Sequence, residues 1–205
     1  MLTAEDFRRR FRDFVPDQRE RRWAVLVPLV QQQGRWHLLF EVRASGLDRQ
    51  PGEICFPGGA LEPGETAEQC ALRETEEELG IPPSAVSVIS PLDTVDPIDA
   101  GRLRPILAEL APGAEERIVL NPEEVREVFL VPLEALEQPS FRYRHTISPD
   151  IGDDFPYDRI GYPDGYTWHV RRAEVVLYEY KGHPIWGLTA RIVEHLMELM
   201  REGSD

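Results

Sequence analysis

The chain contains few cysteines and far fewer basic than acidic residues. Among its 205 residues are two cysteines, 23 lysines and arginines, and 37 aspartates and glutamates. Two cysteines are too few for a disulfide framework, and neither has a partner at metal-site spacing. Cys55 lies in an apolar, strand-like run and Cys70 in a helical pattern. We therefore interpret both as small core residues in a reducing compartment.

Long apolar runs are also missing. No stretch of eighteen apolar residues offers a membrane span, and the arginine-rich residues 1–22 lack the apolar core of a secretory signal. We expect a cytoplasmic protein with no membrane partner. The formal net charge of -14 argues against nucleic acid as a partner, because phosphate backbones are bound by basic surface.

A helix is strongly signalled within the segment from Gly59 to Ile81. Thr66 and Gln69 have the spacing of a capping box, in which each residue bonds the backbone of the other. Gly80 stands where a left-handed C-terminal cap is expected, and two prolines follow it. The pattern predicts a helix that begins after Thr66 and ends at Gly80.

Three glutamates share one face of this helix. Glu74, Glu77 and Glu78 are three and four residues apart, whereas Glu76 falls on a different face. Like charges at this spacing repel, so a fold that keeps them together gains from a bound cation. Carboxylate oxygens without His or Cys suit Mg²⁺ or Mn²⁺, and Mg²⁺ commonly completes its shell with phosphate oxygens. A metal site for a phosphate compound is therefore the first hypothesis, and a solvated acidic helix is the alternative.

The same segment resembles the Nudix box. Thr75 is the one soft position, because the family pattern has an apolar residue there. Family resemblance implies an α/β/α sandwich that hydrolyses a nucleoside diphosphate linked to another group, with divalent ions. The positions that fit the pattern are Gly59, Glu65, Arg73, Glu74, Glu77, Glu78, Gly80 and Ile81.

The resemblance also implies roles for these residues. Glu74 and Glu78 would be direct metal ligands, with the Gly59 carbonyl as a third. Glu77 would be a ligand or the general base, and which glutamate takes the proton stays open.

Arg73 most plausibly pairs with Glu65 and holds the loop against the helix, which its planar fork does better than lysine. With Glu77, these two residues form the expected catalytic group.

An upstream segment resembles the coenzyme A diphosphatase branch of this family. The branch pattern is roughly L-L-T-x-R followed by L-R-x-H-x-G-Q-x-x-F-P-G-G. Here Leu39 to Arg43 and Leu47 to Gly59 occupy these positions. The departures are Asp48, Gln50 and Glu53, and the matches include Arg43, Gly52 and the residues from Phe56 to Gly59.

Two further segments resemble the same branch. The run from Val128 to Leu133 is similar to its V-F-x-V-P-L strand, and the run from Trp186 to Ala190 is similar to W-G-x-T-A. The three segments span the domain.

Substrate-binding candidates lie near the box. Arg43 and Arg49 are candidates for binding a 3'-phosphorylated ADP moiety, and a surface ion pair is the alternative for each arginine. Gly58 is a further substrate-binding candidate. Glu124 and Glu127 are candidates for a second metal ion or a base, against a solvated turn.

The remaining pattern predicts one α/β domain in residues 23–205, with a mixed sheet between helices, and an N-terminal helix with its linker in residues 1–22. Residues 137–172 form a long lid or insertion, rich in aromatic residues, which alternatively closes on itself or contacts a second copy. The expected strands are residues 23–30, 36–42, 85–89, 104–110, 127–131 and 174–180, with helices from residues 3, 133 and 188.

We therefore expect a Mg²⁺- or Mn²⁺-dependent hydrolase that cleaves coenzyme A or a derivative to 4'-phosphopantetheine and 3',5'-ADP. A diphosphatase for ADP-ribose or another dinucleotide is the alternative enzyme. A catalytically silent binding module is the alternative of another class, and a homodimer stays open.

Overall fold

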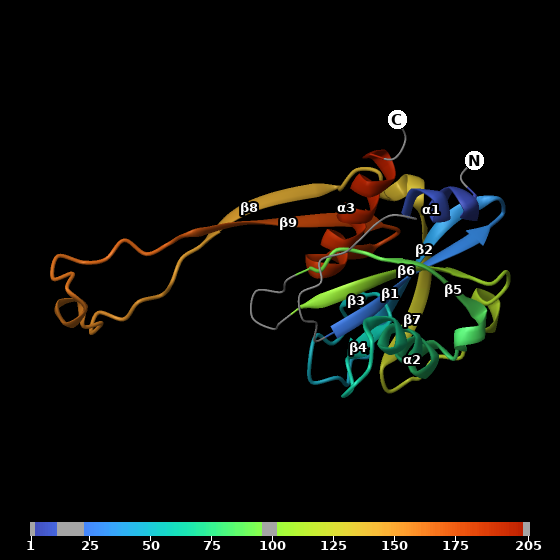
Figure 1. Ribbon diagram of the computed structural model, residues 1–205, viewed down its shortest axis with the longest axis horizontal. Coiled ribbons are helices and arrows are strands. Elements are labelled where there is room, and N and C mark those ends of the chain that lie inside the picture. The colour runs from blue at the N-terminus through green and yellow to red at the C-terminus, as the bar shows by residue number, and fades with distance from the viewer. Residues whose placement is uncertain (1–2, 12–22, 96–101, 203–205) are drawn as a thin grey trace.

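The computed structural model describes residues 3–11, 23–95 and 102–202. A rounded body carries a long two-stranded arm, formed by β8 and β9, which projects far to one side (Figure 1). The helices are α1 (Ala4–Phe11), α2 (Ala67–Leu79) and α3 (Gly187–Glu202). The strands are β1 (Trp23–Gln32), β2 (Arg35–Arg43), β3 (Ile54–Cys55), β4 (Gly58–Ala60), β5 (Val86–Pro91), β6 (Leu103–Leu110), β7 (Val125–Pro132), β8 (Phe141–Ile147), β9 (Arg171–Tyr180) and β10 (His183–Trp186).

The main sheet is mixed, because β1 runs parallel to β6 and antiparallel to β2. Its strand order is β3-β2-β1-β6-β5, with β7 on the other edge of β2. β3 pairs with β2, whereas β4 pairs with β1. The short segment from Ile54 to Ala60 therefore fills the fork where β1 and β2 separate, and it delivers the chain to the start of α2.

Apolar side chains alternate along the central strands and build a core on each face of this sheet. On one face, Leu26 and Leu39 pack with Cys70 and Leu79 of α2. On the other face, residues of β1 and β2 pack with α3, α1 and the second sheet. The order of layers is helix, sheet, helix, as expected for an α/β sandwich.

The N-terminal helix lies against the second face. Phe7 and Phe11 are buried, and the ring of Phe7 meets Trp36 edge-on at 5.1 Å between centroids. Arg8 binds Glu109 of β6 at 2.8 Å. The linker expected to follow, residues 12–22, lies outside the described residues.

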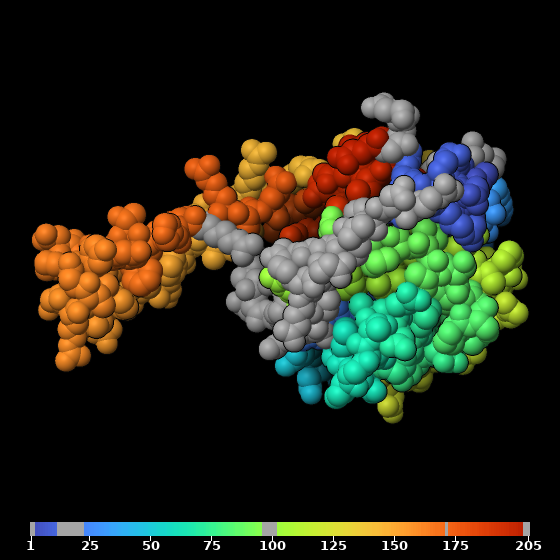
Figure 2. All heavy atoms as spheres, viewed as in Figure 1, coloured from blue at the N-terminus to red at the C-terminus, as the bar shows by residue number. Residues whose placement is uncertain are grey.

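The arm belongs to a second sheet of order β10-β9-β8. Beyond Ile147 the chain closes on its own aromatic rings, since Phe155, Tyr157 and Trp168 contact one another and Tyr166 extends the cluster. Figure 2 shows this tip standing clear of the body. Residues 137–172 lead away from the body in this conformation, and their role as a lid or an insertion stays a prediction.

The expected strands are present, with ends that differ by up to three residues, as is usual for element boundaries. The expected helix from Leu133 is a four-residue 3-10 turn, η3 (Leu133–Leu136). No helix in the described ranges is long and apolar enough to cross a membrane.

Candidate active site

Helix α2 begins and ends as its sequence predicts. The Thr66 side chain accepts from the Gln69 backbone at 3.2 Å, and the Gln69 side chain accepts from the Thr66 backbone at 2.9 Å. Gly80 adopts the left-handed conformation, with φ of 67°, and its N–H donates to the Glu76 carbonyl. Both ends of the helix are thereby closed, which fixes the rotation of its glutamates relative to the sheet.

The two glycines of β4 let the loop come very close to its neighbours. A Cβ at Gly58 would overlap the Ala24 carbonyl and the Val25 backbone on β1. A Cβ at Gly59 would overlap the carboxylate of Glu74. Glycine is required at Gly58 because backbone fills the space, whereas a side chain at Gly59 would push the Glu74 carboxylate out of its place.

Arg73 is the hub of the loop and helix. Its guanidinium binds both carboxylate oxygens of Glu65, at 2.9 and 3.1 Å, as predicted. The same group also binds Glu74 at 2.8 Å and Glu77 at 3.0 Å. The hydrogen bond from Arg73 holds the pKa of Glu65 below its usual range. One arginine therefore fastens the loop and two of the three clustered glutamates.

The three glutamates differ in their surroundings. Glu77 is 54% exposed, whereas Glu78 is 3% exposed and accepts from the Gly58 N–H at 2.8 Å. Burial, and next the charge of Glu41, raises the pKa of Glu78 to about 9. Burial also raises the pKa of Glu74. The acidic face thus grades from solvent at Glu77 to a buried carboxyl at Glu78.

Glu41 belongs to the same centre and was not among the expected site residues. It is 1% exposed, and its Oε1 accepts from the Cys55 Sγ at 3.1 Å. Burial raises its pKa to about 7, against the hydrogen bond from Cys55 and the charge of Arg43. The sequence signal is limited to one acidic residue between Phe40 and Val42 in an apolar strand, and the structure adds that Glu41 shares the face of Leu39, which packs against α2.

A loop after β6 closes the far end of the helix. The Val119 N–H donates to the Leu79 carbonyl and the Asn121 N–H to the Glu78 carbonyl, both at 2.9 Å. The Ala44 N–H donates to the Glu124 carbonyl at 2.8 Å. These bonds place Glu124 beside the acidic centre, where its charge raises the pKa values of Glu41 and Glu78.

The remaining candidates lie at the margin. Arg43 donates from Nε to the Arg49 carbonyl at 3.4 Å, and Arg49 itself is exposed. Glu127 pairs with Arg126 at 2.9 Å and shares the sheet face of Phe129, which packs with the core opposite α2. Of the two extra acidic candidates, only Glu124 joins the centre.

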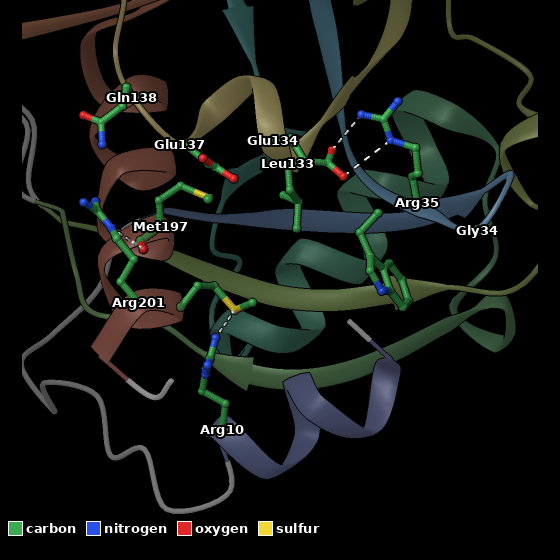
Figure 3. Close-up of a pocket in the computed structure, with 11 residues that line it drawn as sticks. Arg10, Gly34, Arg35, Leu133, Glu134, Glu137, Gln138, Met197 and Arg201 are labelled. Atoms are coloured by element: carbon green, nitrogen blue, oxygen red, sulfur yellow. Dashed lines mark hydrogen bonds and ion pairs between the residues drawn. The ribbon is translucent and has the colours of Figure 1, made fainter. Parts of the chain in front are cut away.

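Two cavities lie away from this centre. A space of about 640 Å³ lies between α1, the β1–β2 turn, η3 and α3, on the opposite face of the sheet from α2 (Figure 3). Arg35 and Glu134 pair across its rim at 3.2 Å. A smaller space of about 340 Å³ lies at the edge of β2 and β3, lined by Glu53, Glu127, His183 and Trp186 among others.

The donor set fits a divalent cation. The charges of Glu41, Glu74 and Glu124 each raise the pKa of a neighbouring carboxyl, and Glu41 Oε2 is buried without a hydrogen-bond partner. In the described residues, no three His, Cys, Asp or Glu side chains converge closely enough to hold an ion as they stand. Arg73 engages Glu74, and the Gly58 N–H engages Glu78. Excess buried negative charge with only oxygen donors calls for a hard cation.

Fold and site define a class: an α/β protein with a carboxylate centre between a capped helix and a mixed sheet. The NUDIX domain model matches residues 20–148. Peroxisomal coenzyme A diphosphatase NUDT7 of Mus musculus is 37% identical over 147 residues, which are 71% of this chain and 61% of the mouse protein. The uncharacterized Nudix hydrolase NudL of Escherichia coli O6:H1 is 34% identical over 204 residues, covering 95% of this chain and 93% of NudL.

Solved structures show weaker similarity. DR0079 from Deinococcus radiodurans is 20% identical with a TM-score of 0.49, covering 87% of this chain and 86% of that chain. The Ap4A hydrolase of C. elegans is 24% identical with a TM-score of 0.47, covering 55% of this chain and 80% of that chain.

The chain belongs to the Nudix hydrolase family. Members of this family act on small-molecule nucleotide diphosphates and generally use divalent metal ions. The chain spans less than two thirds of the mouse enzyme and nearly all of NudL.

Proposed function

We propose that this enzyme is a Mg²⁺- or Mn²⁺-dependent diphosphatase of coenzyme A or its derivatives. The products are 4'-phosphopantetheine, or its acyl form, and 3',5'-ADP. The observation that carries the chemistry is the buried carboxylate centre, in which Glu78 is 3% exposed beneath the Gly58–Gly59 loop. The substrate rests on similarity to the mouse coenzyme A diphosphatase.

The chain's own groups divide the work. Glu74 and Glu78 hold the cation, with the Gly59 carbonyl beside them. Glu77 is exposed at 54%, and this position suits either a ligand or a base that takes a proton from water. Bound metal supplies positive charge that attracts the diphosphate and lowers the pKa of a coordinated water.

Arg73 and Glu65 contribute by positioning the loop and the glutamates of α2. Their double hydrogen bond fixes the loop, and the remaining Arg73 nitrogen aims the carboxylates of Glu74 and Glu77. When cation is present, Arg73 must share these carboxylates with it, which sets how tightly the ion is held. We assign Arg73 as a positioning residue.

Substrate contacts beyond the diphosphate come from the β2–β3 connection in this proposal. Arg43 lies close enough to the centre to lower the pKa of Glu41 by its charge. Arg49 is exposed on the same loop and free to turn toward a 3'-phosphate. The Gly58 N–H donates to Glu78, so its role toward substrate requires that carboxylate to move.

Both cysteines are free, as in a reducing compartment. We include a cytoplasmic location in the proposal, with a small-molecule substrate and neither nucleic acid nor membrane as partner. A homodimer stays open.

A substrate panel tests the proposal. Coenzyme A, acyl-coenzyme A, ADP-ribose, NADH and diadenosine polyphosphates are assayed with Mg²⁺ and with Mn²⁺. Turnover of the coenzyme A compounds alone supports the proposal, whereas turnover of ADP-ribose alone selects the other diphosphatase. No turnover of any compound with either ion selects the silent binding module.

A further inference from the structure

Glu41 is the least satisfied acidic group of the centre. Its side chain is 1% exposed, and its Oε2 has neither solvent contact nor a hydrogen-bond donor. Only Oε1 is engaged, by the Cys55 thiol, which is a weak donor. A buried carboxylate with an oxygen that accepts no hydrogen bond destabilises the fold unless a positive charge or a proton neutralises it.

The fold places Glu41 on the sheet face that α2 covers. Glu41 pairs with Cys55 on β3 and with Val128 on β7, so it lies in the interior of the sheet. It shares the face of Leu39, whose core includes α2. Across that face stands Glu78, close enough that the charge of Glu41 raises its pKa.

The neighbouring positive charges are already engaged or distant. Arg73 binds three glutamates, none of which is Glu41. Arg43 lies near enough to act on Glu41 through its charge, but its Nε donates to the Arg49 carbonyl. No arginine therefore donates to Glu41 Oε2 in the described part of the chain.

We propose that Glu41 is a metal ligand, and that Glu41 and Glu78 hold one divalent cation between the sheet and helix α2. Cys55 is a positioning residue that occupies Oε1 and leaves Oε2 for the ion. This inference rests on the proposed metal-dependent function and adds a ligand from the sheet to the carboxylates of the helix.

A shared proton is the competing explanation, since two adjacent carboxyls also relieve their repulsion by protonation. The two explanations differ in what Glu41→Gln does. A glutamine replaces the proton-bearing carboxyl at little cost, whereas it cannot replace a ligand oxygen without loss of charge. The difference appears in ion binding and does not need substrate.

The test is Mn²⁺ titration of the full-length protein by calorimetry and electron paramagnetic resonance, without substrate. We expect Glu41→Gln to weaken Mn²⁺ binding by about tenfold or more, or to remove one binding site. Without metal, its thermal stability should equal or exceed that of the wild type, because a buried charge is gone. Glu109→Gln is the matched control, since Glu109 lies on β6 and pairs with Arg8 on the opposite face.

Two further variants guard against misfolding. Glu41→Asp keeps the charge and should restore part of the Mn²⁺ affinity, and Cys55→Ala should weaken it by less than Glu41→Gln does. Equal Mn²⁺ affinity and stoichiometry in Glu41→Gln and wild type would overturn the inference, as would a wild type that binds no Mn²⁺. Should Glu41→Gln fail to fold, Glu41→Asp decides: a Mn²⁺ affinity below that of the wild type supports the ligand, and wild-type affinity overturns it.

Substrate turnover is measured separately. If the enzyme does not hydrolyse coenzyme A but its Mn²⁺ binding depends on Glu41, the proposed substrate is wrong and the proposed ligand stands. If the enzyme hydrolyses coenzyme A but its Mn²⁺ binding does not depend on Glu41, the proposed substrate stands and the proposed ligand is wrong.

Discussion

The carboxylate centre beneath α2 and the β8–β9 arm differ in which side chains they bury and which they expose. The centre beneath α2 buries charge, with Glu41 and Glu78 almost fully hidden. The arm exposes apolar rings, with Phe141 and Tyr143 both more than half exposed on β8. Buried charge is costly and calls for a ligand, whereas exposed rings on a projecting strand call for contact with something outside the chain.

The difference also concerns how each region is held. The centre is fastened by bonds between segments distant in sequence, such as the Glu78 carboxylate to Gly58 and the Asn121 N–H to the Glu78 carbonyl. The arm tip is closed by rings close in sequence, such as Phe155 and Tyr157 at 4.9 Å. We expect changes in the centre to affect chemistry and stability together, and changes in the tip to affect neither much.

The largest effect should come from Glu78→Gln. Its carboxylate is the most buried of the helix, and losing a proposed metal ligand should lower kcat by about 100-fold or more. The measurement is steady-state turnover at saturating Mg²⁺. Exposed Glu76 on the same helix is the control, because Glu76→Gln should leave turnover unchanged. Turnover by Glu78→Gln equal to that of the wild type would remove Glu78 from the site.

The paired glycines should separate fold from chemistry. Gly58→Ala puts a methyl group into the backbone of β1 and should destabilise the fold by about 1–3 kcal/mol. Gly59→Ala meets only the Glu74 carboxylate, so we expect it to lower turnover with a smaller loss of stability. Urea unfolding and turnover of both variants make the comparison. A reversed order would show that β4 does not lie as close to β1 as the structure has it.

Arg73→Lys tests the hub. Lysine keeps the charge but cannot make both hydrogen bonds to Glu65 while it also binds Glu74. Turnover should therefore fall by about tenfold to 100-fold. The far-ultraviolet circular dichroism spectrum should match the wild type and so exclude unfolding. A variant with full turnover would reduce Arg73 to a surface ion pair.

Stability without metal should fall as pH rises. The pKa values of Glu41 and Glu78 are raised from an ordinary 4.5 to about 7 and about 9. Between these limits the folded chain binds more protons than the unfolded chain, so the free energy of unfolding decreases with pH. Urea unfolding in a chelator at about pH 5.5 and about pH 8.5 measures this slope. Glu41→Gln should flatten it, and an unchanged slope would contradict the assignment.

The smallest effect should come from shortening the arm. Ile147 and Arg171 are register partners at the end of the β8–β9 ladder, so a two-residue Asn-Gly turn can join them directly. Turnover and midpoint of urea unfolding should stay near the wild-type values, because the tip contacts mainly itself. A drop in turnover would show that the arm reaches a site, in its own chain or in a second copy, and would end the contrast between the two regions.

Local patterns were enough to predict α2 and its hub. A capping box, a terminal glycine and glutamates at helical spacing depend on contacts within a few residues, and the structure has the cap and the Arg73–Glu65 pair. Glu41 was missed because a single acidic residue in a strand does not say what lies above it. Glu124 and Glu127 were indistinguishable in sequence, since their faces depend on how the loop after β6 is bonded.

The sequence by itself therefore determined the family, the carboxylate helix and the class of chemistry, since these follow from short-range spacing that no other part of the chain has to complete. Only the tertiary structure decided that β2 adds Glu41 to the centre, that β3 and β4 fill the fork between β1 and β2, and that the arm leads away from the site. Each of these depends on strands distant in sequence meeting at a given register, and register is set by the packing of the whole sheet.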